Sequence, residues 1–227
     1  MDIVSVPLEI MKNTWKYLGV ALVFYSLIVG LLGPVPRLVI LNETIRNLYF
    51  HVPMWFTMIT LFGASVGYSI GSLRKNSLRH DLTAAVLAEV GVLFAVAGLL
   101  TGMVWAKFTW GAFWTNDPKL NGTAISMLIY LAYFVLRSSV EDPEKKARLS
   151  AVYNVFAFAL MIVFIGILPR LTESLHPGNG GNPAFSNYDL DSNMRAVFYP
   201  AVLGWILIGF WIAQIKTRLS FLETPWD

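Results

Sequence analysis

The side chains in this sequence that are most suited to chemistry belong to two histidines. His51 lies in "NLYFHVPMWF" and His176 lies in "SLHPG", far apart along the chain. Two neutral imidazoles that face each other can supply both axial ligands of a haem iron. A histidine near the start of a helix is more often a cap or an interface residue, so both interpretations stay open from spacing alone. The third histidine, His80, lies among basic residues and is most simply solvated.

An aromatic segment lies between the two histidines. "WAKFTWGAFWTNDPKL", residues 105–120, holds three of the chain's eight tryptophans. A flat, mostly apolar porphyrin favours such rings against its face and cations near its propionates. Tryptophan is also enriched at membrane interfaces, so the segment could instead anchor the chain. The density of rings in one short segment argues against a simple interfacial belt, and from the residues alone the anchor and the ligand-binding surface both stay open. The cations that could meet the propionates are Arg46, Lys119, Arg170 and Arg195.

The elements that position these side chains are membrane spans. Hydrophobic residues make up 56% of the 227 residues and the mean hydropathy is +0.59, whereas soluble domains are about 45–50% apolar. A bilayer core needs roughly 20 apolar residues per helix. The sequence therefore predicts an all-α, polytopic integral membrane protein, one integral domain over 1–227. The predicted spans are about 14–32, 50–72, 82–104, 121–137, 149–168 and 195–215, with 105–120 as a tryptophan-rich outer loop and Pro169 ending the fifth span.

The placement of basic residues predicts the orientation of these spans. With the N-terminus inside, eleven of the 17 lysines and arginines fall in the inner segments, which is the bias of cytoplasmic loops. Both termini are then cytoplasmic, and both His51 and His176 are outside. Pro53 suits the first turn of the second span, and Trp55, four residues after His51, shares its helical face. His176 lies in an outer connection of roughly 25 residues, longer than spans need.

The residues resemble a known family. "WGAFWTNDPKL" resembles the tryptophan-rich signature, the WWD domain, of the haem-handling proteins of cytochrome c biogenesis, the CcmC–CcmF–CcsA family. "FHVPMW" is similar to the family's His-Val-Pro start of the second span, and "SLHPG" resembles the segment with its second histidine. Six spans in a chain of this length are similar to the CcmC type. Phe113-Trp114 stands where the family has paired tryptophans. Asn116 stands where the family has a further tryptophan just before the aspartate.

The resemblance implies a cofactor site and partners. It implies that His51 and His176 are the axial ligands of a non-covalently bound haem b on the periplasmic face of a bacterial inner membrane. It also implies handover to a membrane-anchored haem chaperone (CcmE-like), together with an ABC transporter of ATPase and membrane subunits (CcmA-like and CcmB-like) and a small CcmD-like subunit. No nucleic-acid partner is expected, and the chain is expected to be an assembly factor, not an enzyme. The residues expected around the haem are Trp55, Trp105, Trp110, Gly111, Phe113, Trp114, Asp117 and Lys119.

Two alternatives stay open. "DPKL" looks closer to the CcsA branch, which would make the chain a haem-handling subunit of a cytochrome c synthetase. From a different class, six spans with Glu89 inside the third are compatible with a small secondary transporter or channel, although the matched interrupted helices of such proteins are not found. Glu89 is equally explained by a bond to a neighbouring helix. The absence of cysteine excludes disulfides and thiolate metal sites, and no Ser/His/Asp grouping points to an enzyme.

Overall fold

The chain folds into a bundle of long helices. The computed structural model describes residues 5–177 and 190–223, and within these ranges six helical segments are long and apolar enough to cross a membrane. The protein is therefore an all-α, multi-pass membrane protein, as the hydropathy predicted. The elements in chain order are α1 (Ser5–Leu32), η1 (Asn42–Asn47), α2 (Leu48–Lys75), α3 (Leu78–Trp110), α4 (Pro118–Ser139), α5 (Pro143–Met161), η2 (Ile162–Ile167), α6 (Leu168–Leu171) and α7 (Ser192–Glu223).

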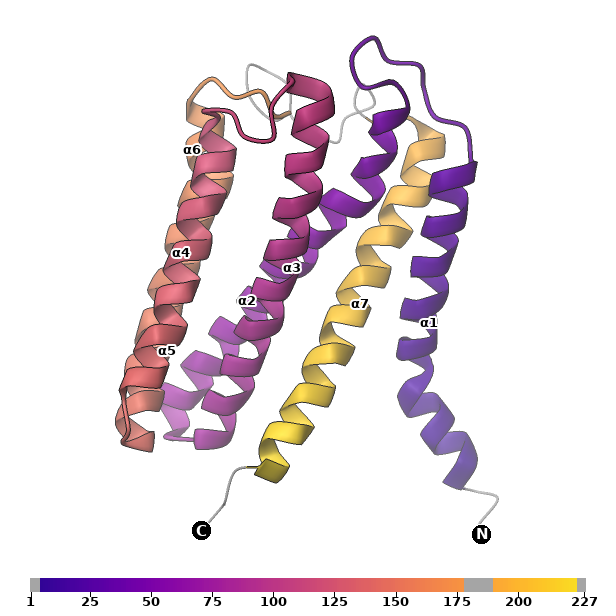
Figure 1. The fold of residues 1–227 in the computed structure, drawn as a ribbon. Helices are drawn as coiled ribbons and strands as arrows, with labels where there is room; N and C mark the ends of the chain where they lie inside the picture. The colour runs from indigo at the N-terminus through magenta and orange to yellow at the C-terminus, as the bar shows by residue number, and fades with distance from the viewer. Residues whose placement is uncertain (1–4, 178–189, 224–227) are drawn as a thin grey trace.

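Helix α2 is the centre of the bundle. It packs along α3, α5 and α7, while α4 packs on α5, and α1 packs mainly on α7. Figure 1 shows that α2 is strongly inclined: it lies beside α5 at the end that carries the α2–α3 and α4–α5 connections and beside α7 and α1 at the other end. The inclination separates α2 from α5 and α6 at the end where α3 connects to α4. This end of the bundle encloses a cavity, and we call it the cavity end.

The tryptophan-rich segment is mostly helical, which differs from the loop predicted over 105–120. Helix α3 continues through Trp110 and α4 begins at Pro118, so the connection covers only 111–117. Gly111, with φ +85°, ends α3 in the left-handed region that glycine adopts without strain. Asp117 caps α4, and Pro118 follows at a position where its missing N–H is no loss. Trp105 and Trp110 are therefore held on a helix.

The fifth span continues through Pro169, where the sequence predicted its end. α5 passes into the π-helical segment η2 and then into α6, which contains Pro169. The N–H of Leu168 bonds to the carbonyl of Val163, five residues back, which accommodates a proline that cannot donate. Gly122 of α4 lies directly against the carbonyl of Phe164, and a Cβ at residue 122 would overlap it. This close approach fixes η2 against α4.

Buried polar contacts join the helices away from the cavity end. Arg137 donates to both carboxylate oxygens of Asp81, at 2.7 and 2.8 Å, and so joins α4 to α3. The amide of Asn154 donates to the hydroxyls of Ser65 and Ser69 at 2.7 and 2.9 Å and joins α5 to α2. In a bilayer the lipid tails are as apolar as the helix surfaces, so apolar contact alone selects no particular neighbour. These polar bonds therefore help to specify which helices pack together.

Glu89 has a partner on a neighbouring helix. Its carboxylate accepts from the ammonium of Lys216 on α7 at 2.5 Å. The ion pair offsets the cost of an ionisable group within a span. The contact supports the structural explanation of Glu89.

Candidate functional site

A cavity of about 400 Å³ lies at the cavity end, between α2 and α3 on one side and α4, η2 and α6 on the other. Its walls are mainly apolar, with Trp55, Ile59 and Leu99 among the lining side chains. His51 and His176, 125 positions apart in the sequence, both line it. The size is within the range of pockets that hold small molecules and cofactors. The cavity is therefore where the two predicted ligands could act on one molecule.

His51 is held in one orientation by α3. Its Nδ1 lies 2.9 Å from the carbonyl oxygen of Gly98 and 3.2 Å from Oγ1 of Thr101. A carbonyl oxygen only accepts, so Nδ1 carries the proton and the lone pair is on Nε2. This is the arrangement of a metal-binding histidine, in which the other ring nitrogen donates to a backbone carbonyl. The indole N–H of Trp55 donates to that Nε2 at 3.2 Å.

Two glycines of α3 make room for these rings. A Cβ on Gly102 would lie 2.5 Å from Cε1 of His51, and a Cβ on Gly98 would lie 2.9 Å from Cε2 of Trp55. Both separations are below van der Waals contact between carbon atoms. Gly98 and Gly102 are one helical turn apart, as are His51 and Trp55, so the two pairs match face to face. We call the space beside these glycines the glycine slot.

A methyl group in the glycine slot is expected to displace His51. In Gly102→Ala the imidazole must move away from α3, which breaks its bond to the Gly98 carbonyl; over-packing of this kind costs about 1–3 kcal/mol. We expect the variant to bind the haem that the resemblance implies more weakly than the wild type, by roughly 10-fold or more, as changes to groups that orient a metal ligand do. Haem titration followed by absorption measures this. Gly67→Ala is the matched control, because a Cβ there meets nothing within 4 Å; equal affinities for both variants would contradict the role of the slot.

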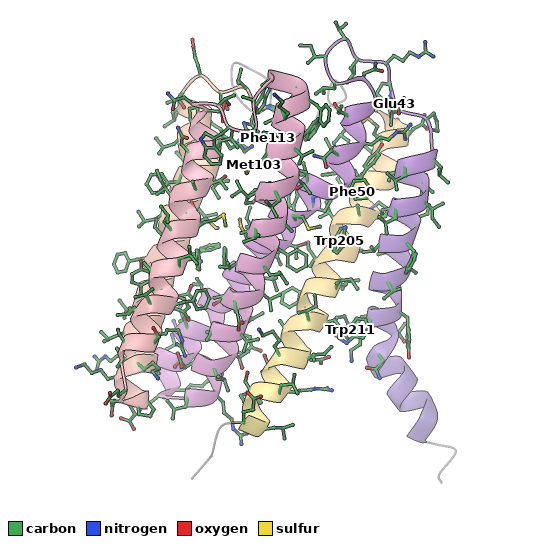
Figure 2. The ribbon with its side chains drawn as sticks, viewed as in Figure 1. Glu43, Phe50, Met103, Phe113, Trp205 and Trp211 are labelled. Atoms are coloured by element: carbon green, nitrogen blue, oxygen red, sulfur yellow. The ribbon has the colours of Figure 1, made fainter. Side chains whose placement is uncertain are left out.

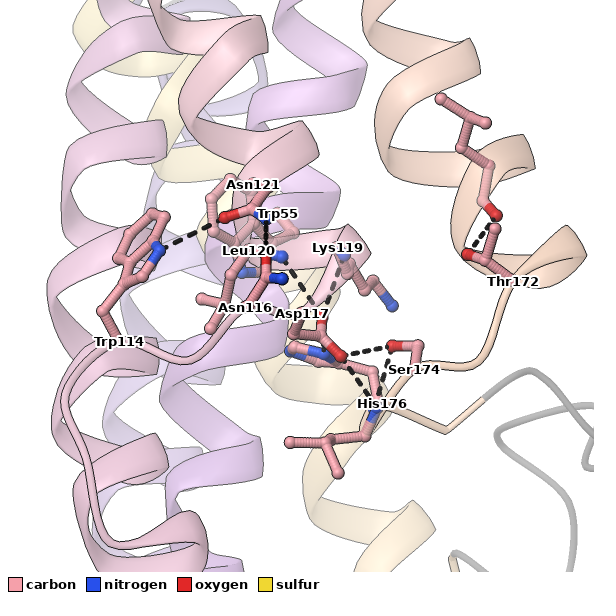
Figure 3. Close-up of polar contacts among 12 residues, drawn as sticks. Trp55, Trp114, Asn116, Asp117, Lys119, Leu120, Asn121, Thr172, Ser174 and His176 are labelled. Carbon is pink, nitrogen blue, oxygen red and sulfur yellow. Dashed lines mark hydrogen bonds and ion pairs between the residues drawn. The ribbon is translucent and has the colours of Figure 1, made fainter.

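His176 is held by Asp117, across 59 positions of sequence. Nδ1 of His176 lies 2.9 Å from Oδ1 of Asp117, and its backbone N–H donates to Oγ of Ser174 at 3.1 Å. Figure 3 shows this contact at the start of α4. The carboxylate orients the ring and leaves Nε2 with the lone pair, the pattern of a carboxylate–histidine–metal triad. Both histidines therefore have Nδ1 bonded to an oxygen acceptor.

Asp117 also fixes the segment that carries His176. Its side chain is 1% exposed and accepts from the backbone N–H groups of Lys119 and Leu120 at the start of α4. The hydroxyl of Ser174 and the N–H of Leu175 donate to Oδ2 at 2.8 and 2.7 Å. Burial acts to raise the pKa of Asp117, but the bonds from His176, Leu175 and Ser174 outweigh it and hold the pKa below the ordinary 3.8.

The aromatic residues divide between the cavity and the surface. Trp105 and Trp110 line the cavity. The ring of Trp105 stands edge-on to His51, with the ring centroids 5.8 Å apart. The ring of Trp110 stands edge-on to His176, with the centroids 4.9 Å apart. Phe113 and Trp114, on the 111–117 connection, do not line it and are 52% and 39% exposed. Figure 2 shows Phe113 at the cavity end, beside the end of α3.

The four predicted cations also divide. Lys119 and Arg170 line the cavity. Arg46 and Arg195 do not: the guanidinium of Arg46 donates to the carbonyls of Gly30 and Gly33 at 2.9 and 2.7 Å and pairs with Glu43, and Nε of Arg195 donates to the carbonyl of Leu190 at 3.0 Å. The carbonyls at the C-terminal end of α1 attract the Arg46 cation. Positive charge at the cavity therefore comes from Lys119 and Arg170.

Asn116, where the resemblance implies a tryptophan, takes part in a polar chain. Its side-chain oxygen accepts from the amide of Asn121 at 2.8 Å, and the oxygen of Asn121 accepts from the indole N–H of Trp114 at 3.2 Å (Figure 3). These bonds tie the 111–117 connection to the first turn of α4. Gly111, like Asn116, lies outside the cavity lining.

Sequence reasoning named Asp117 but missed the other residues that orient the two histidines. Thr101, Ser174 and the glycine slot carry no signal that singles them out, although "GLLTG" has glycines one turn apart. It also missed η2, from which Ile162, Ile165 and Gly166 line the cavity. π-helical turns occur often at functional sites. The only sequence sign of η2 is Pro169, which was expected to end the span.

Comparisons with known proteins identify the family of the chain. Residues 6–225 match the family model of heme exporter protein C (CcmC). The chain is 32% identical over 114 residues to heme exporter protein C of Bradyrhizobium diazoefficiens, covering 50% of this chain and 43% of that protein. It is 27% identical over 181 residues to that of Paracoccus denitrificans (78% and 73% covered), and 22% identical over 189 residues to that of Escherichia coli K12 (82% and 75%). Since the family model covers nearly all of it, the chain belongs to the heme exporter protein C family.

Proposed function

We propose that this protein binds one haem b non-covalently in the cavity, with His51 and His176 as axial ligands, and holds it for transfer to a partner. The observation that carries the proposal is that the two imidazoles share one hydrogen-bonding arrangement. Each lines the cavity and has Nδ1 bonded to an oxygen acceptor, which leaves the lone pair on Nε2. Membership of the heme exporter protein C family supports haem as the ligand.

The rest of the cavity suits a porphyrin. Its walls are mainly apolar, and the rings of Trp105 and Trp110 stand beside the two histidines. Lys119 and Arg170 supply positive charge for the propionates. Two imidazole ligands saturate the iron and leave no free coordination position. The chain then acts as a carrier of haem, not as an enzyme.

We place the cavity end on the periplasmic side of a bacterial inner membrane, because the basic residues concentrate in the segments at the opposite end. The 227 residues then form one integral domain with both termini in the cytoplasm. Phe108, Phe113 and Trp114 are exposed aromatic residues at or near the end of α3, at the cavity end, where a haem chaperone of the CcmE type can approach. An ABC transporter with CcmA-like and CcmB-like subunits, and a small CcmD-like subunit, complete the proposed partners.

Titration of the purified full-length protein with haem tests this function. We expect binding of one haem per chain, with the Soret and visible bands of low-spin, bis-histidine iron. Co-expression with the ATPase and membrane subunits should yield a complex that purifies together. A protein that binds no haem, or only with a high-spin spectrum, would contradict the proposed ligation and leave the transporter alternative.

A further inference from the structure

The Nε2 atom of His51 already has a partner in this structure. The indole N–H of Trp55 donates to it at 3.2 Å, with the two ring planes at 81° and their centroids 5.9 Å apart. An imidazole nitrogen has one lone pair, so it can accept one hydrogen bond or bind one metal, but not both. We propose that Trp55 competes with the haem iron for Nε2 of His51 and so weakens haem binding at this ligand and promotes release. This inference rests on the proposed function.

The position of Trp55 results from several contacts. Trp55 follows His51 by one helical turn, which brings the two rings together on one face of α2. Gly98 lies against Cε2 of Trp55, where a Cβ would come within 2.9 Å, and the same residue's carbonyl oxygen lies 2.9 Å from Nδ1 of His51. The backbone at residue 98 therefore orients the imidazole while the missing side chain leaves room for the indole.

Trp105 provides an internal comparison. It also lines the cavity and stands edge-on to His51, with ring centroids 5.8 Å apart. Its indole N–H, however, donates to Oγ1 of Thr44 at 3.2 Å. The two tryptophans thus make similar ring contacts with His51, but only Trp55 is bonded to Nε2. Trp55 is a positioning residue that acts through His51.

The competition has consequences for both the haem-free and the loaded protein. In the haem-free protein the indole covers the lone pair of His51. In the loaded protein Nε2 is on the iron, and the Trp55 N–H must find another acceptor or water. The loss of one such bond corresponds to about 1 kcal/mol, or roughly a five-fold weaker affinity. A carrier that transfers its ligand benefits from this weakening, since a readily exchanged axial ligand lets the partner's ligand take its place.

The haem-free protein allows a test that is independent of haem. Diethyl pyrocarbonate acylates the lone pair of neutral imidazole, and mass spectrometry resolves the peptides of the three histidines. In Trp55→Phe, which keeps a ring but lacks the N–H, we expect His51 to be labelled about five-fold faster than in the wild type. His80, at the opposite end of the bundle, is the reference within the same molecule. Trp105→Phe should leave the His51 rate near that of the wild type, and equal rates in Trp55→Phe and the wild type would overturn the inference.

The second measurement follows haem release to an excess of a haem-scavenging apoprotein. Trp55→Phe is expected to release haem about five-fold more slowly than the wild type while keeping a low-spin spectrum. Trp211→Phe on α7, which lies outside the cavity lining, should release haem at the wild-type rate. Release that is unchanged or faster in Trp55→Phe overturns the competition. A wild-type protein that binds no haem overturns the proposed function as well, and the labelling rates then still report whether Trp55 covers His51.

Discussion

Replacing either cavity histidine with glycine is expected to convert the bound haem from low-spin to high-spin iron and to weaken binding by more than the roughly 10–100-fold that outer-shell changes cost. In His51→Gly the glycine slot remains, and free imidazole can occupy the space of the lost ring. Added imidazole should therefore restore the low-spin spectrum. His176→Gly should behave in the same way, because Asp117 remains to accept a bond from the added imidazole.

His80→Gly is the control for this experiment. His80 is in the first turn of α3, where Nδ1 lies 2.9 Å from Oγ of Ser77, at the end of the bundle opposite the cavity. Its spectrum should match that of the wild type. Low-spin haem that persists in both cavity variants without imidazole would show that other residues are the ligands.

Changing Asp117 is expected to have the second large effect, on both stability and haem binding. In Asp117→Ala the start of α4 loses its cap and the donors of Ser174, Leu175 and His176 lose their acceptor. A lost cap and lost bonds to a buried charge together cost about 3 kcal/mol or more. The melting temperature of the detergent-solubilised protein should fall accordingly, and His176 should no longer be oriented towards the cavity.

Asp117→Asn separates these two effects. One side-chain oxygen can still cap α4, but the amide nitrogen cannot accept from Leu175 or Ser174. We expect a smaller loss of stability and a haem affinity lower by about 10–100-fold, since the group that orients His176 has changed. Thermal unfolding and haem titration measure the two effects. A wild-type affinity in Asp117→Asn would show that the segment carrying His176 does not depend on this carboxylate.

The lowered pKa of Asp117 also sets a pH dependence. Because its pKa is below the ordinary 3.8, the carboxylate stabilises the fold above that value and loses this contribution only as the pH falls through its lower folded-state pKa. The contribution of Asp117 to stability should therefore persist from neutral pH to about pH 4 and disappear at more acidic pH. The difference in unfolding free energy between the wild type and Asp117→Asn, measured across this range, should shrink only at the acidic end.

Hydropathy and short-range spacing were enough to predict the six spans and the shared helical face of His51 and Trp55. The six spans follow from apolar runs that only a helix can place in a bilayer. The pairing of His51 with Trp55 follows from their spacing of one helical turn. The end of α3 was less predictable, because Trp105 and Trp110 continue an apolar helix well beyond the minimum length of a span. Gly111 and Asp117 set the limits of the connection, and both conformations are local.

Other features depend on which helices are neighbours, and local spacing carries no information about that. Asp117 meets His176 across 59 positions only because α4 and the segment after α6 lie side by side. Arg46 was expected at the haem propionates. In the fold its guanidinium instead donates to the carbonyls at the end of α1, away from the cavity lining. The chain's residue types therefore limited the chemistry to two imidazoles, aromatic rings and cations. Helix packing selected which of them share one cavity, because the inclination of α2 and the π-helical turn before Pro169 determine where that cavity lies.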